Sequence, residues 1–112
     1  RLTAHTSHLP HLLSFALMRL AMDGAAEDSA LLELAAGGFD GATRLARTDA
    51  AMIVGMFSTN AELLRETAAR LRAHLDRLEA LLDEPEQLEQ ELSAIVAARR
   101  AYTATYGERL IT

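Results

Sequence analysis

The sequence predicts an all-α domain, on three observations. Half of its residues are hydrophobic but only 4% are aromatic, and most of the apolar side chains are Leu and Ala, which lose little entropy on entering a helix. There are only two prolines, and β-branched residues never form an extended run. The length of 112 residues suits a single domain with its own core.

Charge and composition exclude several classes of function. The net charge is -5, with 11 basic residues, all of them Arg, and no cluster of cations interleaved with aromatics predicts nucleic-acid binding. The absence of cysteine excludes disulfides and thiolate metal sites and fits a cytoplasmic protein. No apolar stretch reaches the roughly 20 residues needed to span a bilayer. Because the chain begins at Arg1 without Met, we expect a fragment of a longer protein.

The first helix should begin near Ser7, a suitable N-cap, with Pro10 in its first turn. From His11 to Met22 apolar side chains cover nearly every face, so we expect this helix to be buried on more than one side. Asp23 and Gly24 should end it. A short helix should then run from a cap at Asp28–Ser29 to about Ala36.

The glycine-rich segment 37–41 is predicted to form a tight bend, because regular apolar spacing resumes directly after it. Thr48 or Asp49 can cap the following helix. Thr59 and Glu62 then have the spacing of a capping box, which predicts another helix start.

Two long helices with heptad spacing complete the chain. Asp83–Pro85 should separate them, with Pro85 in the first turn of the last helix and Gly107 as its stop. We expect them to form an antiparallel hairpin whose seams need a partner surface, either the first helix or a second copy. The seam residues are Leu64, Ala68, Leu71, Leu75, Leu78 and Leu82, then Leu88, Leu92, Ile95, Tyr102 and Tyr106.

His8 and His11 lie three residues apart and should share a face at the start of the first helix. A helix N-terminus favours anions, so the pair could bind a small carboxylate. They could equally cap the helix, or form a transition-metal pair, although no nearby Asp, Glu or Cys completes a ligand set. His5 and His74 have no supporting context and should lie at the surface.

Arg44 follows the glycines within a small, apolar segment, and a guanidinium can clamp a carboxylate through two hydrogen bonds. It could also be solvated, or paired with Asp40 or Asp49. Gly37 and Gly38 could bring the backbone close to a ligand, or could end a helix.

Taken together, Ser-His-Leu-Pro-His at 7–11, Ala-Gly-Gly-Phe at 36–39 and Thr-Arg-Leu-Ala at 43–46 resemble signatures of the prephenate/arogenate dehydrogenase family. The resemblance implies that residues 1–112 form a dimeric helical C-terminal domain, with a fold like the C-terminal domain of 6-phosphogluconate dehydrogenase. It further implies an upstream Rossmann domain, absent from this chain, that carries NAD or NADP and a catalytic His. We therefore expect no catalytic residue, cofactor or metal in this chain.

The family oxidatively decarboxylates prephenate to 4-hydroxyphenylpyruvate in tyrosine biosynthesis. By resemblance, Arg44 would clamp a carboxylate of prephenate or arogenate, and His11 would line the same pocket. Ser7 and His8 would support that pocket, and Gly37 would offer a backbone contact. The resemblance also implies a cytoplasmic homodimer, with tyrosine as a possible inhibitor.

Two other interpretations remain open at this point. A stand-alone helical dimerisation or adaptor module would explain the heptads and the acidic charge, but not the His and Gly-Gly-Phe signatures together. The helical domain of another two-domain dehydrogenase usually carries a catalytic Lys, and this chain contains no Lys.

Overall fold

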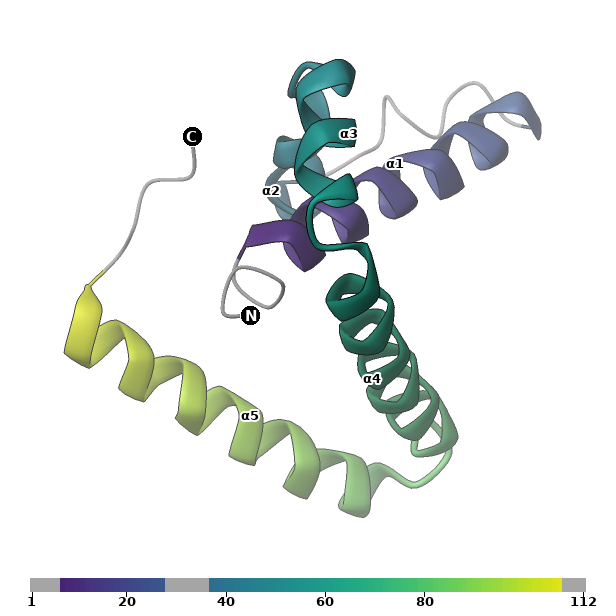
Figure 1. The fold of residues 1–112 in the computed structure, drawn as a ribbon. Coiled ribbons are helices and arrows are strands. Elements are labelled where there is room, and N and C mark those ends of the chain that lie inside the picture. Colours follow the sequence, from purple (N-terminus) through teal and green to yellow (C-terminus); the bar gives the residue numbers. More distant parts are fainter. Residues whose placement is uncertain (1–6, 28–36, 108–112) are drawn as a thin grey trace. The chain divides into compact units, whose positions relative to one another are not determined.

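The computed structural model describes residues 7–27 and 37–107. All regular elements within these ranges are helical, which confirms the predicted all-α class (Figure 1). The chain divides into two units, with the boundary between Ala68 and Ala69. The elements in order are α1 (Leu9–Glu27), α2 (Gly37–Thr43), the 3-10 turn η2 (Arg44–Arg47), α3 (Ala50–Ser58), α4 (Ala61–Ala80) and α5 (Pro85–Tyr106).

In the first unit, α1 packs against both α2 and η2. Apolar side chains buried in this unit come from α1, α3 and the start of α4, and three polar side chains are buried with them. The apolar residues are Ala21, Ile53, Leu64 and Ala68, and the polar residues are His8, Ser14 and Thr67.

Helix α1 is longer and less covered than predicted. It continues through Asp23 and Gly24 to Glu27, because alanines follow the glycine and Arg19 pairs with Asp23 across one turn at 3.5 Å. The expectation of burial on several sides is wrong within this chain, since Leu13 and Leu20 are 42% and 68% exposed. The neighbours α2 and η2 cover only part of its apolar surface.

The predicted tight bend at 37–41 is also wrong, because these residues form most of α2. Of the described glycines, only Gly107 has a positive φ, so Gly37, Gly38 and Gly41 lie in ordinary helical backbone. Contact with α1 stabilises a helix here despite the low helix propensity of glycine. The short helix expected between Asp28 and Ala36 lies outside the described residues.

Of the two capping predictions, the one for the start of α3 is confirmed and the one for the start of α4 is wrong. Asp49 caps α3, its carboxylate accepting from the N–H of Ala51 at 3.1 Å, as one of the two alternatives predicted. A helix does begin after Thr59, but the capping box is not formed. The Thr59 hydroxyl donates to the Met56 carbonyl at 2.8 Å, and Glu62 pairs with Arg65 at 2.8 Å.

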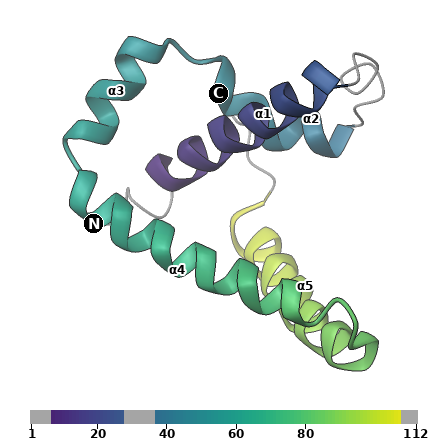
Figure 2. The same cartoon turned by 90° about the vertical axis from the view of Figure 1, so that its right-hand side faces the viewer.

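In the second unit, the end of α4 and the whole of α5 are joined by a short turn (Figure 2). As predicted, α5 begins at Pro85, and Gly107 caps its end with φ 73°, its N–H donating to the Thr103 carbonyl at 2.7 Å. Near the turn, Arg77 and Glu91 form an ion pair at 3.6 Å, and Leu81 is buried.

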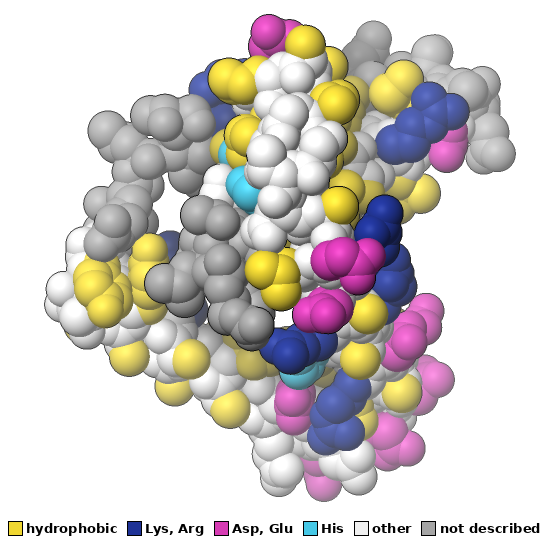
Figure 3. Space-filling model, in the orientation of Figure 1, with side chains coloured by type: hydrophobic (Ala, Val, Ile, Leu, Met, Phe, Trp, Pro, Cys, Tyr) yellow, Lys and Arg dark blue, Asp and Glu magenta, His cyan; other side chains and the backbone are white. Residues whose placement is uncertain are grey.

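The heptad seams do not cover each other in the single chain. Leu75 and Leu82 of the first seam are 63% and 66% exposed, and Ile95 of the second is 50% exposed. Figure 3 shows apolar side chains at intervals along α5. Two helices joined by a turn are therefore present as predicted, but α4 and α5 do not pack along each other as an antiparallel hairpin, and their seams remain available to a partner surface.

Candidate functional site

The first candidate residues lie where the chain enters α1. The His11 ring bonds through Nδ1 to the Ser7 carbonyl oxygen at 2.9 Å. A carbonyl can only accept, so Nδ1 is the donor, and Nε2 is the ring nitrogen left to meet another group. His11 is half-buried. The contribution of Ser7 to this arrangement is made by its backbone.

His8 lies in a different environment from His11. Its side chain is buried, and its ring meets Phe57 of α3 edge to face, with centroids 6.5 Å apart and an angle of 63° between the planes. Its Nδ1 is buried without a hydrogen-bond partner, an arrangement that costs free energy in a protein interior. His8 therefore joins the start of α1 to α3, and its predicted role in supporting a pocket remains a prediction.

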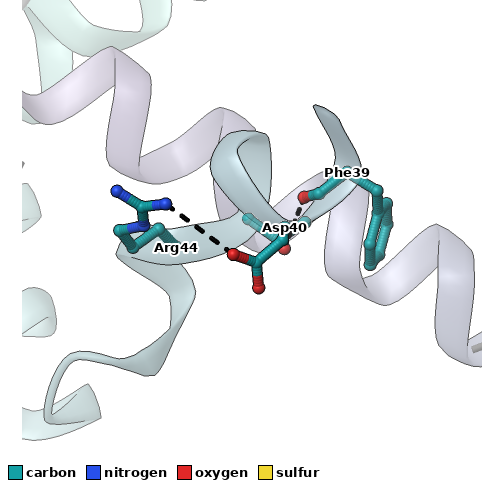
Figure 4. Close-up of polar contacts among 4 residues, drawn as sticks. Phe39, Asp40 and Arg44 are labelled. Atoms are coloured by element: carbon teal, nitrogen blue, oxygen red, sulfur yellow. Dashed lines mark hydrogen bonds and ion pairs between the residues drawn. The ribbon is translucent and has the colours of Figure 1, made fainter. Parts of the chain in front are cut away.

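Arg44 is the first residue of η2 and pairs with Asp40 one turn earlier, with 3.7 Å between Nη2 and Oδ2 (Figure 4). This pairing is one of the alternatives predicted for Arg44. The Asp40 side chain is 82% exposed and that of Arg44 39%. Such an exposed, single long contact contributes roughly 0–1 kcal/mol. A ligand carboxylate that forms two hydrogen bonds with the guanidinium could therefore displace Asp40 at little cost.

Two hydroxyl groups hold the segment that leads into Arg44. Thr43 donates through Oγ1 to the Phe39 carbonyl at 2.8 Å, which closes the last turn of α2 (Figure 4). Ser14 of α1 donates through Oγ to the Ala42 carbonyl at 2.6 Å. The second bond crosses from α1 to α2, so the helix that carries His11 is tied to the segment that carries Arg44.

Gly37 is the first residue of α2 and is exposed. A Cβ built on Gly37 would meet nothing within 4 Å, so no neighbour described in this chain requires glycine here. The predicted contact through Gly37 remains a prediction.

Ser14 is the residue that the sequence analysis missed. It is 3% exposed and lies among apolar side chains. One signal could have found it, because it is the only hydroxyl residue between His11 and Met22. Buried hydroxyls in apolar helices require a hydrogen-bond partner, and the partner here lies on another element.

The described residues give little support for other kinds of site. No three His, Asp or Glu side chains among them are grouped to hold a metal ion. A dinucleotide site needs a strand, a glycine-rich turn and a helix, and the described parts of the chain contain no strand. The described residues therefore do not form such a site on their own. Within the same ranges, no helix is long and apolar enough to cross a membrane.

Comparison with known proteins shows which family the chain belongs to. Residues 1–98 match the protein family described as "Prephenate dehydrogenase, dimerization domain". The chain belongs to this family. It is also 35% identical over 78 residues to the prephenate dehydrogenase of Lactococcus lactis subsp. cremoris (strain MG1363). That alignment covers 70% of this chain but 22% of the relative, so the chain spans about a fifth of the length of that dehydrogenase.

The family membership confirms the resemblance seen in the Ser-His-Leu-Pro-His, Gly-Gly-Phe and Thr-Arg segments, and the helical fold agrees with a prephenate dehydrogenase dimerization domain. All of these segments lie within the matched residues. The match concerns the domain as a whole, so the roles of individual side chains are taken up below as proposals.

Proposed function

We propose that this chain is the substrate-binding and dimerisation part of a prephenate dehydrogenase, which converts prephenate to 4-hydroxyphenylpyruvate. The observation that carries the proposal is the hydrogen bond from Ser14 of α1 to Ala42, which ties the helix of His11 to the segment of Arg44. A cation and an imidazole on adjoining elements suit a substrate with two carboxylates.

Within this proposal, Arg44 binds a carboxylate of prephenate, or of arogenate, in place of its weak contact with Asp40. His11 lines the same pocket through the Nε2 side of its ring. Ser7 and His8 support the pocket, Ser7 through its bond with His11 and His8 through its packing on Phe57. Gly37 offers a backbone N–H. These residues orient the substrate and match its charge, and none of them transfers a proton or hydride.

NAD or NADP would supply the oxidant in the proposed reaction, in which a hydride leaves the hydroxyl-bearing ring carbon and the ring carboxylate leaves as carbon dioxide. The described residues do not form a dinucleotide site on their own, so we assign no cofactor contact to this chain. We propose that the cofactor and the catalytic base belong to another part of the longer, cytoplasmic enzyme.

We further propose that the enzyme is a homodimer. The exposed apolar side chains of α4 and α5 support this, because a heptad seam that is solvated in the single chain is covered when a second helix packs on it. They include Leu75, Leu92, Ile95, Val96 and Tyr102 of the two helices, and Leu82 of the turn between them is exposed as well. Tyrosine, which resembles the product in its phenol ring and carboxylate, is a candidate inhibitor at the Arg44 pocket.

The first test is turnover by the full-length parent protein, with prephenate and arogenate offered separately and formation of the reduced cofactor followed by absorbance. Oxidation of either compound supports the proposal and identifies the substrate. A folded protein that oxidises neither would favour the stand-alone dimerisation module instead.

The second test replaces Arg44 with Ala in the full-length enzyme. Loss of a charge-assisted carboxylate contact should raise the KM for prephenate at least about tenfold, equivalent to roughly 1.5–3 kcal/mol, and leave the KM for the cofactor nearly unchanged. Arg47→Ala is the matched control, because it removes the same charge from the same 3-10 turn at an exposed position. An unaltered prephenate KM in Arg44→Ala would contradict the assignment.

A further inference from the structure

Ser14 makes a contact that distinguishes it from the threonines described in its unit. Its bond to the Ala42 carbonyl spans 28 residues of sequence, whereas Thr43, Thr48 and Thr67 donate to carbonyls three or four residues away. Those local bonds stabilise single turns. The Ser14 bond instead joins two separate elements of the fold.

The two ends of this bond lie close in sequence to the proposed binding residues. Ser14 is three residues after His11, about one turn along the same side of α1. Ala42 is two residues before Arg44 and lies at the end of α2, among the carbonyls that an α-helix leaves without an internal partner. The Ser14 hydroxyl therefore supplies a hydrogen-bond donor at the point where α2 ends and η2 begins.

The segment that carries Arg44 has little stability of its own. Helix α2 has seven residues, three of them glycine, and η2 has four. Isolated helices of this length are unstable in water, and 3-10 turns have poor hydrogen-bond geometry. The position of Arg44 must then come from contacts with α1. Apolar contacts are not directional, whereas a hydrogen bond of 2.6 Å fixes which carbonyl faces Ser14.

We infer that Ser14 is a positioning residue for substrate binding: its hydroxyl holds the Ala42 carbonyl and so keeps Arg44 in register with His11. This inference rests on the proposed function, because it gives Ser14 an effect only through Arg44. Ser14 does not touch the substrate. Its loss displaces the guanidinium, and small displacements of a positioning group have large kinetic effects.

The test is a double-mutant cycle of Ser14→Ala and Arg44→Ala in the full-length enzyme, with KM and kcat measured for substrate and cofactor. Ser14→Ala should raise the prephenate KM about fivefold to tenfold, as expected for one buried hydrogen bond, and leave the cofactor KM within about twofold. In the Arg44→Ala background, the same change should have almost no further effect on KM, because the group that it positions is gone.

Thr67→Val is the matched control. Thr67 is also buried, at 6% exposure, and its hydroxyl donates to the Leu63 carbonyl within the same helix at 2.8 Å. Its replacement should lower the melting temperature without raising the prephenate KM. An equal rise in KM for Thr67→Val would mean that any buried hydroxyl in this unit acts through stability, and the inference about Ser14 would be wrong.

The remaining outcomes separate this inference from the proposed function. If Arg44→Ala leaves the prephenate KM unchanged, both fail. If Arg44→Ala raises KM while Ser14→Ala does not, or if the two effects simply add, only the positioning role fails. Should Ser14→Ala not fold, Ser14→Cys keeps nearly the same shape with a much weaker donor. A folded Ser14→Cys enzyme should show the raised KM, and an unchanged KM would overturn the inference.

Discussion

Both units expose large apolar side chains, but among the described residues the buried polar side chains all belong to the first unit, up to Ala68, whereas in the second, from Ala69, the exposed apolar side chains follow two long helices. Ser14 and Thr67 are 3% and 6% exposed, while Ile95 is 50% exposed. A buried hydrogen bond fixes one arrangement of the chain, and an exposed apolar seam needs another surface to cover it. The first unit is therefore suited to positioning a site, and the second to association.

The largest expected effect comes from placing a charge within the exposed apolar seam of α5. Ile95→Glu should convert the proposed homodimer of the full-length enzyme to monomer, because an unpaired carboxylate would be buried in an apolar interface. Analytical ultracentrifugation measures the change. Gln90→Glu adds the same charge to another face of α5, at an exposed position, and should leave the dimer intact. Dissociation by both variants would point to net charge rather than to the seam.

The second prediction compares stability in the two units. Leu64 is 6% exposed in the first unit, so Leu64→Ala should lower the free energy of unfolding by about 2–4 kcal/mol through lost burial and a cavity. Leu75 in the second unit is 63% exposed. Leu75→Ala, measured in the monomeric Ile95→Glu background, should cost less than about 0.5 kcal/mol.

Urea unfolding followed by circular dichroism gives both values. Equal costs for Leu64→Ala and Leu75→Ala would show that the seam around Leu75 is covered within one chain, against its exposure in the structure.

The smallest expected effect concerns Asp40, which in the proposed site competes with the substrate for Arg44. Asp40→Asn removes a carboxylate 3.7 Å from the guanidinium and should lower the prephenate KM by up to about fivefold, since an exposed pair contributes no more than roughly 1 kcal/mol. Asp49→Asn is a suitable control, because an Asn can also cap α3 and the change in net charge is the same. A higher KM in Asp40→Asn would mean that Asp40 orients Arg44 instead of competing for it.

The elements were predicted well where a local signal determines them. Asp49 as a cap, Pro85 at a helix start and Gly107 at a helix end each act through the backbone of neighbouring residues, and sequence shows such effects directly. The glycine segment at 37–41 was misassigned because its conformation depends on packing against α1, which local propensity does not contain. The coverage of α1 and of the heptad seams depends in the same way on surfaces outside the local sequence.

The residues of the candidate site were likewise predicted or missed according to whether a sequence pattern marks them. The family signatures lead to Arg44 and His11, since these residues carry recognisable chemistry at recognisable spacings. Ser14 stayed unnoticed, because a serine in an apolar helix has no meaning until its partner is known, and that partner is a backbone carbonyl of α2. Every residue has such a carbonyl, so no sequence pattern marks Ala42.

The bond between His11 and Ser7 also determines how the ring can meet a ligand. A backbone carbonyl occupies Nδ1, so Nε2 is the one ring nitrogen left for another molecule. A polar group of a ligand must therefore approach the ring along the direction of Nε2, which makes recognition at His11 depend on the shape of the ligand as well as on its charge.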